Sequence, residues 1–285
     1  MIIFLGDGRL GNQIFQYGFI MNFYQDEEII ITTNFNQLIE LFEVKVKLIN
    51  INNRYLRYIM NNYIKLFIKL IAYLRIISSV KSKKVYVNKY LIEDSDYIFK
   101  HGMLPIKYVF EGVYQSEKLI NMYNKQLKIK YKYINEATKI IYSLPQNTFK
   151  IFVHIRRTDY SYHSCLGYKD IRLPLNYYMN AIKSIISSFN NVYFIFLSDD
   201  IDYVTKNFKN IENKYISNDN EYVDFSIMSL CEGGILSNSS FSWWGAYFIK
   251  NKNIIISPKY WIGFKSKIEY PRGITPSFSL VYKVD

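Results

Sequence analysis

The segment HIRRTDY at residues 154–160 places a histidine, two arginines and a carboxylate at the end of the apolar run IFVHI. Polar residues at the carboxyl end of a buried parallel strand lie where α/β proteins bind their ligands. A guanidinium keeps its charge and its planar fork matches phosphate oxygens, so Arg156 or Arg157 is suited to neutralise a diphosphate. The alternative is an arginine pair that only forms a surface ion pair with Asp159.

A second polar stretch, NSSFS at residues 238–242, follows the apolar run GGIL. Its small amide and hydroxyl side chains, together with backbone N–H groups, can complete a cradle for phosphate oxygens. The alternative is an ordinary serine-rich turn. The next two residues are Trp243 and Trp244, and we expect at least one of them to pack in the core rather than against a ligand.

Three carboxylates are further candidates. Asp199 and Asp200 follow the strand-like run VYFIFLS, where a carboxylate can bind a ribose or a metal ion. Adjacent side chains of an extended chain point apart, which disfavours a shared metal ion, so we expect no metal site. Asp224 begins the helix-like run EYVDFSIMSL, where it either complements the helix N-terminus or accepts two hydrogen bonds from a guanine edge.

The glycines Gly6, Gly8 and Gly11 form the pattern G-x-G-x-x-G between a strand-like and a helix-like run. This pattern is typical of a dinucleotide-binding turn, in which the backbone approaches a pyrophosphate at a helix N-terminus. Such a site also needs an acid after the second strand, but here neutral TTN ends the run IIIT and the acids of QDEE precede it. The sequence therefore favours a different ligand, beside Arg9 and Asn12.

The composition limits the class of protein. The 285 residues are 49% hydrophobic, which is enough for two packed domains or one large one. The net charge of +12 suits a nucleic acid, an anionic membrane or a phosphorylated small molecule. Two cysteines without a C-x-x-C pair predict neither a disulfide framework nor a zinc site, and no signal peptide or long apolar span is evident. We expect a cytoplasmic protein.

Strand-like and helix-like runs alternate, which predicts an α/β fold with parallel sheets. In the second half the expected elements are the strand at 151–155, a helix at 175–189 and the strand at 192–198. Two openings from strand to helix, near residues 2 and 151, each look like the start of a unit of their own. The turn-rich segment SLPQNT separates them, so we expect domains over residues 1–146 and 147–285.

Residues 44–92 contain eleven basic residues and no acid. At about 100° per residue, part of this segment predicts a basic amphipathic helix, which can lie in the interface of an anionic bilayer. The alternative is that its apolar face packs on the first domain's sheet while its lysines are solvated. The polar face would carry Arg57, Asn61, Lys65, Lys69 and Arg75, and the apolar face Ile59, Phe67, Leu70, Leu74 and Ile77.

In order and spacing, five segments together resemble the bacterial α-1,2-fucosyltransferases and, more distantly, the wider fucosyltransferase superfamily with its α-1,6 and protein O-fucosyl enzymes. The resemblance runs from end to end, and it implies a GT-B-like α/β fold of two Rossmann-like domains facing across a cleft, the first on the acceptor side and the second binding the GDP-sugar. The segments are GRLGNQIFQYGF from Gly8, EGVYQSEK from Glu111, HIRRTDY from His154, LSDD from Leu197 and SIMSLCEGGILSNSSFSWWGA from Ser226.

The same resemblance implies an inverting, metal-independent transfer of fucose from GDP-fucose to the 2-hydroxyl of a galactoside in a bacterial surface glycan such as an O-antigen. No cofactor is expected beside the donor substrate. The expected partner is a galactose-containing oligosaccharide, and a lipid-linked acceptor would make contact with an anionic membrane useful. The alternatives are transfer from another GDP-sugar and, from the basic charge alone, a nucleic-acid-binding protein; we expect no nucleic acid.

The resemblance also assigns roles. Arg156 would hold the β-phosphate and His154 the nucleotide side, while Asp224 would read guanine. A base must accept the proton of the acceptor hydroxyl, and His154, Asp159 or the leaving phosphate itself are the candidates. One departure is Gly233, where relatives commonly carry a histidine. Further donor-side residues are Gly8, Arg9, Gly11 and Asn12 beside the fucose, Asn12 also as a catalytic residue, Ser239 and Ser240 at the diphosphate, and Asp199, Asn238 and Phe241.

Overall fold

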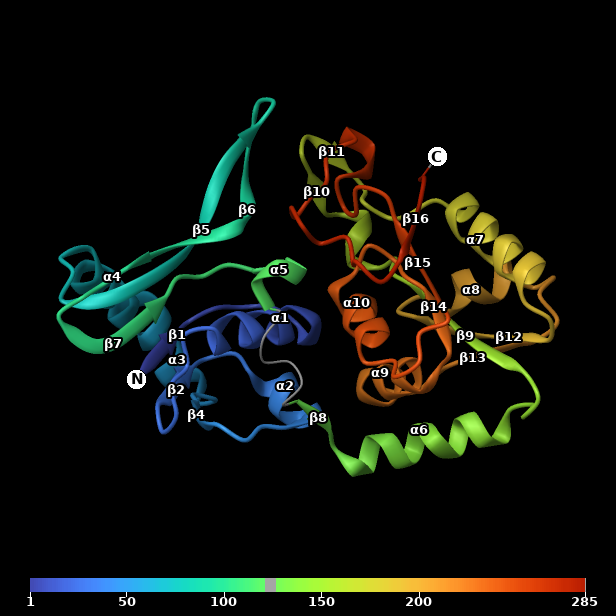
Figure 1. Cartoon of the computed structure of the whole chain (residues 1–285), viewed down its shortest axis with the longest axis horizontal. Helices are drawn as coiled ribbons and strands as arrows, with labels where there is room; N and C mark the ends of the chain where they lie inside the picture. The colour runs from blue at the N-terminus through green and yellow to red at the C-terminus, as the bar shows by residue number, and fades with distance from the viewer. Residues whose placement is uncertain (121–126, 285) are drawn as a thin grey trace. The chain divides into compact units, whose positions relative to one another are not determined.

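The computed structural model describes residues 1–120 and 127–284 and divides the chain into two compact units, Met1–Lys128 and Ile129–Asp285 (Figure 1). The division precedes helix α6 (Tyr131–Ser143), whereas the boundary expected from the sequence lies at residues 146–147. Helix α6 packs on α9 (Glu221–Leu230), and the ring of Tyr133 lies 5.1 Å from that of Tyr222. This contact explains why α6 belongs to the second unit.

The first unit contains a six-stranded sheet. All neighbouring strands are parallel except the last pair, and that pair extends beyond the sheet as a long arm (Figure 1). In spatial order the strands are β4 (Lys47–Asn50), β2 (Ile29–Thr32), β1 (Ile2–Phe4), β7 (Leu104–Val109), β5 (Ile77–Val87) and β6 (Tyr90–Lys100).

Helix α1 (Leu10–Met21) is the central helix of the first unit, because nearly all of its residues are buried. A ring stack of Phe19 on Tyr114, with centroids 3.8 Å apart, joins it to the segment that follows β7. The remaining elements of this unit are α2 (Asn36–Leu41), β3 (Phe42–Glu43), α3 (Arg54–Ile59), the π-helical turn η1 (Met60–Ile64), α4 (Lys65–Tyr73) and α5 (Glu117–Ile120), with β8 (Lys128–Ile129) at the division.

The second unit contains a six-stranded sheet in which every neighbouring pair is parallel. Counted along the chain within this unit, the strand order is 3-2-1-4-5-6, the order of doubly wound nucleotide-binding sheets. The expectation of a parallel α/β sheet is confirmed here. In spatial order the strands are β13 (Lys214–Ile216), β12 (Val192–Ser198), β9 (Phe149–Ile155), β14 (Gly233–Ile235), β15 (Ile254–Pro258) and β16 (Leu280–Tyr282).

The core of the second unit follows from the alternation of side chains along β9. Ile151, Val153 and Ile155 belong to an apolar cluster with Tyr177 and Tyr178 of helix α7. Trp243 and Trp244 are both fully buried, which confirms that at least one belongs to the core. The remaining elements are α7 (Leu175–Ser188), α8 (Ile201–Asn207), α10 (Ser240–Tyr247), the strands β10 (Ser164–Cys165) and β11 (Tyr168–Lys169), and the short helices η3 (Asp159–Ser161) and η4 (Phe264–Ser266).

The basic segment forms α3, η1 and α4 in succession, but its orientation differs from the expected packing of an apolar face on the sheet. Ile68 and Ala72 are the buried residues of α4, while Phe67 and Leu70 are 61% and 54% exposed. The two expected faces are kept within α4, where Lys65 and Lys69 lie opposite the exposed Phe67 and Leu70. The helix ends at Tyr73, however, so Arg75 and Ile77 lie beyond it, and Ile77 begins β5. Among the described residues, no helix is long and apolar enough to span a membrane.

Gly233 begins the central strand β14 and allows its neighbours to approach closely. A Cβ atom at this position would lie 2.5 Å from the backbone oxygen of Ile254 and 2.6 Å from Cδ1 of Ile151. Because the first neighbour is backbone, the strands themselves must shift to admit a side chain. The same contact means that a larger side chain at this position needs a change of this backbone.

We therefore expect Gly233→Ala to lower the free energy of unfolding by about 1–3 kcal/mol, as overpacking of a tight core does. Thermal unfolding followed by circular dichroism measures this as a lower Tm. Ser187→Ala, at an exposed position of α7, is the control and should change stability by less than about 0.5 kcal/mol. Equal Tm values for parent and Gly233→Ala would contradict the close approach.

Candidate functional site

The carboxyl ends of three strands of the second sheet lie side by side, because β9 pairs with both β12 and β14. The strand order reverses between β9 and β14, and such a switch point is where open α/β sheets bind ligands. The residues at these strand ends are His154 in β9 and Arg156–Asp159 after it, Asp199 after β12 and Ser237–Asn238 after β14. The topology thus brings three of the sequence-predicted segments together.

Arg156 is held between two carboxylates. Its Nε and Nη2 atoms each donate to one oxygen of Asp159 at 2.9 Å, and its Nη1 lies 3.2 Å from Oδ2 of Asp199. Burial alone would lower the pKa of Arg156, but the hydrogen bond to Asp159 and the charge of Asp199 raise it above its ordinary value. The guanidinium is therefore a permanent, oriented positive charge with a side chain 17% exposed.

Asp199 also fixes the loop after Arg156. It accepts hydrogen bonds from the backbone N–H groups of Arg157 at 2.8 Å and Thr158 at 3.2 Å. Asp200 turns to a different partner and caps helix α8 by accepting from the N–H of Tyr203 at 2.9 Å. As expected for adjacent residues, the two carboxylates have separate partners.

His154 is buried in the sheet, with 5% of the residue exposed. Its Nδ1 lies 2.7 Å from the hydroxyl oxygen of Ser237, and its ring lies 5.4 Å from that of Phe241. Burial and then the charge of Arg156 lower the pKa of His154 to about 3, against the opposing charge of Asp199. The imidazole is thus neutral near pH 7 and a weak base.

The loop between β14 and α10 is joined to the arginine by Tyr160. The Tyr160 hydroxyl donates to the backbone oxygen of Asn238 at 3.1 Å, and Cζ of Arg156 lies 5.7 Å from the Tyr160 ring centroid. Asn238 donates from Nδ2 to the oxygen of Ile171 at 2.7 Å, so it fixes a neighbouring loop. Ser239 is the N-cap of α10, and Ser240 is its first residue. The predicted phosphate-side serines therefore lie at a helix N-terminus close to the arginine.

Asp224 lies in the first turn of α9, beside Phe225, whose ring lies 5.6 Å from Phe241. Oδ1 of Asp224 accepts from the hydroxyl of Ser217 at 2.6 Å. Burial raises the pKa of Asp224 to about 7, because the Ser217 hydrogen bond only partly opposes it and Asp219 adds to it. The predicted guanine reader is therefore a carboxyl group near its titration point at neutral pH.

Three functional neighbours were absent from the sequence prediction. Tyr160, Ser237 and Ser217 hold Asn238, His154 and Asp224 respectively. Tyr160 and Ser237 lie inside the motifs HIRRTDY and ILSNSSF, so their closeness in sequence to the candidate residues could have indicated them. Ser217 lies outside every motif, and only the parallel pairing of β13 with β12 shows its position.

The glycine turn belongs to the first unit. Gly8, between β1 and α1, has a φ of +136°, which favours glycine, and its backbone oxygen accepts from Gln13 at 2.9 Å and Asn34 at 2.8 Å. Asn34 stands just after β2, near the place where a dinucleotide site needs an acid, and here it fixes the turn instead. Arg9 is exposed, and Gly11 is buried in the first turn of α1.

The segment from Glu111 to Gln115 lies beside this turn. Nε2 of Gln115 donates to Oδ1 of Asn12 at 2.5 Å, and Gln16 donates to the backbone oxygens of both Asp7, at 2.8 Å, and Gly112, at 3.0 Å. Two of the motif segments therefore form one polar network in the first unit.

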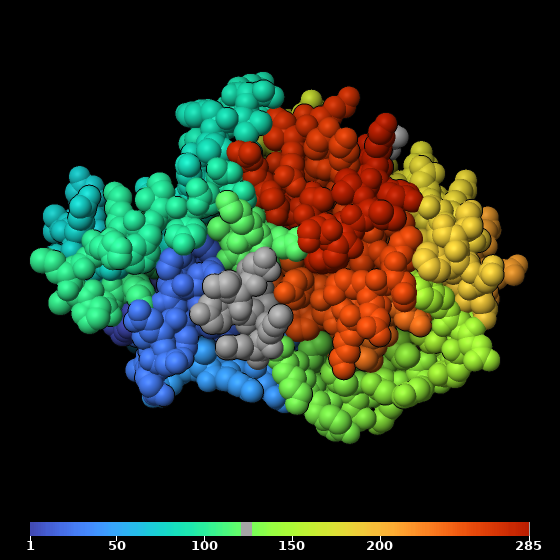
Figure 2. Space-filling view, in the orientation of Figure 1, coloured from blue at the N-terminus to red at the C-terminus, as the bar shows by residue number. Residues whose placement is uncertain are grey.

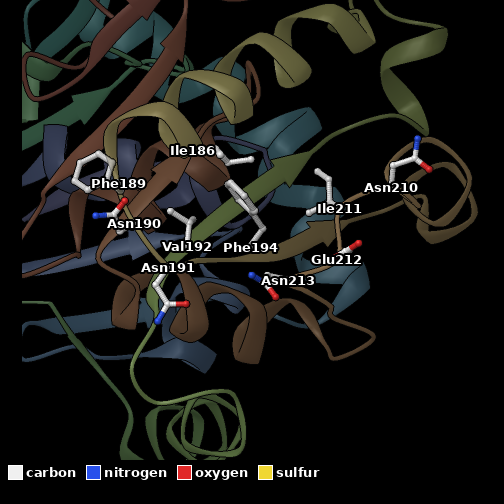
Figure 3. A pocket seen from close by; sticks show the side chains of 10 residues that line it. All are labelled: Ile186, Phe189, Asn190, Asn191, Val192, Phe194, Asn210, Ile211, Glu212 and Asn213. Atoms are coloured by element: carbon white, nitrogen blue, oxygen red, sulfur yellow. The ribbon is translucent and has the colours of Figure 1, made fainter.

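A surface pocket of the second unit lies elsewhere (Figure 3). Its lining includes Asn191, Val192 and Phe194 at the amino end of β12, whereas the candidate residues leave the carboxyl ends of the strands. None of the predicted site residues lines this pocket. It takes no part in the site.

The raised pKa of Asp224 predicts a pH dependence of stability. The folded chain keeps this carboxyl protonated up to about pH 7, while the unfolded chain releases the proton near 3.8, so stability falls as pH rises through this interval. Asp224→Asn cannot release that proton. The free energy of unfolding of Asp224→Asn minus that of the parent should therefore increase with pH, by up to about 1.4 kcal/mol per pH unit, between pH 3.8 and about pH 7. Above about pH 7 the difference should stay constant. Urea unfolding at a series of pH values measures the difference; a constant difference throughout would contradict the raised pKa.

Two curated relatives from Escherichia coli are the O-antigen biosynthesis glycosyltransferase WbnK, 32% identical over 43% of this chain and 42% of its own length, and an alpha-1,2-colitosyltransferase, 33% identical over 53% and 55%. The matches thus span about half the length of these relatives.

The fold is GT-B-like. The solved structure of the α-1,6-fucosyltransferase NodZ from Bradyrhizobium matches with a TM-score of 0.52 at 11% identity, over 86% of this chain and 91% of that one. The model of glycosyl transferase family 11 matches residues 4–269, which is nearly the whole sequence. The chain therefore belongs to glycosyl transferase family 11.

Proposed function

We propose that the chain transfers fucose from GDP-fucose to the 2-hydroxyl of a galactoside in a bacterial surface glycan, with inversion and without a metal ion. The observation that carries the proposal is Arg156, fixed between Asp159 and Asp199 at the switch point of a nucleotide-binding sheet. The similar proteins support it, since one relative is named an O-antigen biosynthesis glycosyltransferase, another an alpha-1,2-colitosyltransferase, and the crystals of NodZ were soaked with GDP-fucose.

The proposed chemistry depends on charge that grows at the leaving group. As the bond from fucose to the β-phosphate breaks, negative charge develops on the phosphate oxygens. A guanidinium already fixed in place stabilises this transition state more than the ground state, without reorganisation. Arg156 has this role in the proposal, with Ser239 and Ser240 at the N-terminus of α10 on the same diphosphate.

Asp224 is assigned to guanine. An ionised carboxylate can accept two hydrogen bonds from the guanine edge, and such donors would favour the charged form of this carboxyl. His154 stays on the nucleotide side as a neutral, buried group, with Phe241 packed between it and Phe225. Asn238 has a positioning role in the same region, because its side chain donates to the backbone oxygen of Ile171 and so holds the neighbouring loop.

The contacts of Asp159 and His154 bear on which group takes the proton of the acceptor hydroxyl. Both oxygens of Asp159 accept from Arg156, so Asp159 is better suited to orient the arginine than to take the proton. The low pKa makes His154 a weak base. We assign Gly8, Arg9, Gly11 and Asn12 of the first unit to the fucose and acceptor side, on the resemblance alone.

A second candidate is transfer of a different sugar, colitose, because one relative bears that activity in its name. The residues assigned to the nucleotide and diphosphate would serve either donor. Metal independence is proposed on the resemblance; in the described part of the chain no three His, Cys, Asp or Glu side chains are grouped as a possible metal site.

Incubation of the purified chain with GDP-fucose and a β-galactoside should release GDP and form a fucosylated product. Mass spectrometry and a GDP assay follow the reaction, and GDP-colitose in place of GDP-fucose tests the second candidate. We expect EDTA to leave the rate nearly unchanged. Folded protein that turns over neither donor would overturn the assignment, and a large loss of rate in EDTA would overturn metal independence.

Arg156→Ala should lower kcat by about 10² to 10³, the usual effect of removing a preorganised group that stabilises developing charge. Arg156→Lys should restore little, because an ammonium lacks the fork that binds Asp159 and a phosphate together. Arg172→Ala, which removes an arginine paired with Asp170 on the same unit, is the matched control. Near-normal kcat in Arg156→Ala with a severe loss in Arg157→Ala would show that the neighbouring arginine has this role.

A further inference from the structure

Helix α4 and the turn before it present a row of large apolar side chains to solvent. Six side chains spaced three or four residues apart, as on one face of a helix, are between 54% and 83% exposed. Monomeric proteins rarely expose contiguous apolar surface of this kind unless it binds something. We call this surface the α4 face; its residues are Tyr63, Leu66, Phe67, Leu70, Tyr73 and Leu74.

The opposite side of the helix anchors it to the first unit. Ile68 and Ala72 are buried against the sheet, in a cluster that includes Ile77 and Tyr108. Lys65 and Lys69 both form ion pairs with Glu111, the latter at 3.2 Å. The ion pairs of the two lysines and the burial of Ile68 and Ala72 fix the rotation of the helix about its axis. The α4 face therefore points toward solvent.

The apolar surface continues past the end of the helix. Arg75 accepts a hydrogen bond from the backbone N–H of Met103 at 3.1 Å, and Ile76 accepts one from Leu104 at 2.9 Å. Met103 is 79% exposed and Leu104 47% exposed. In Figure 2 this part of the chain, blue-green to cyan, lies at the surface of the first unit.

The charge around the α4 face indicates what covers it. No acidic residue occurs between Val44 and Ile92, whereas eleven basic residues do, and Arg54 and Arg75 are exposed at the two ends of the helical stretch. Apolar side chains flanked by cations match an anionic lipid surface, in which the rings and aliphatic groups enter the interface while the arginines remain among the headgroups.

We propose that the α4 face binds the surface of an anionic lipid bilayer. Tyr63, Leu66, Phe67 and Leu70 enter the interface, and Arg54 and Arg75 contact lipid phosphates. The ion pairs of Lys65 and Lys69 with Glu111 connect this helix to the Glu111–Gln115 segment and, through Gln115, to Asn12. Binding of lipid by this surface does not depend on the proposed transferase activity.

Co-sedimentation of the full chain with vesicles tests the proposal. We expect binding to vesicles of phosphatidylcholine with phosphatidylglycerol, little binding to phosphatidylcholine alone, and weaker binding as salt is added. Leu66→Gln with Phe67→Gln and Leu70→Gln should lower the partition coefficient by about tenfold or more. Arg54→Gln with Arg75→Gln should lower it about fivefold for each arginine.

The matched control changes three exposed apolar residues of the second unit, Tyr142→Gln with Ile186→Gln and Leu280→Gln, and should keep the parental binding. An environment-sensitive dye at Leu70→Cys should shift to the blue on anionic vesicles and one at Ile186→Cys should not. Both native cysteines, Cys165 and Cys231, are buried.

Circular dichroism spectra like those of the parent would show that the variants fold. No binding to anionic vesicles, or binding that neither salt nor the α4-face substitutions reduce, would overturn the proposal. A parental dimer that the α4-face substitutions convert to a monomer, seen by light scattering in the absence of lipid binding, would assign the surface to a second copy of the chain instead.

Discussion

The ion pair cluster of Arg156 with Asp159 and Asp199 is the interaction on which the second unit's site depends. A charged group that is largely out of water needs partners, and the guanidinium has two carboxylates, so removing both would leave a partly buried charge uncompensated. The cluster exists because β9 and β12 pair in parallel with Ile155 opposite Ser198, so the residues that follow them meet. A guanidinium has five N–H donors; Asp159 takes one on Nε and one on Nη2, and Asp199 faces Nη1. Donors therefore remain for a phosphate, and Asp199 disperses its own charge over the N–H groups of Arg157 and Thr158.

The other candidate groups follow from the same sheet. His154 lies near the end of β9, on the face opposite Val153 and Ile155, and its Nδ1 is 2.7 Å from the hydroxyl of Ser237 just after β14. Tyr160 returns from the arginine loop to the backbone of Asn238, which sets the start of α10 against that loop. Helix capping, strand pairing and ion pairing thus meet at the carboxyl ends of β9, β12 and β14.

Much of the second unit was predictable because its signals are local. The β-branched and aromatic runs at 151–155 and 192–198 are strands, and the runs at 175–189 and 221–230 form helices that end within a residue or so of the expectation. The partners of the site were harder to predict, because Ser217 reaches Asp224 only through the order of the strands. The first unit departed further from expectation. The basic helix ends at Tyr73 and leaves its apolar face exposed, and α6 belongs to the second unit through its contact with α9, which no local pattern records.

The central claim is that Arg156 recognises the diphosphate of a guanine nucleotide, and the most direct measurement compares the affinities of guanosine, GMP and GDP by calorimetry. For the parent chain, affinity should increase with each phosphate. In Arg156→Ala most of the gain between guanosine and GDP should disappear while the affinity for guanosine stays the same. A gain that survives the substitution, or an equal loss for guanosine and GDP, would contradict the account.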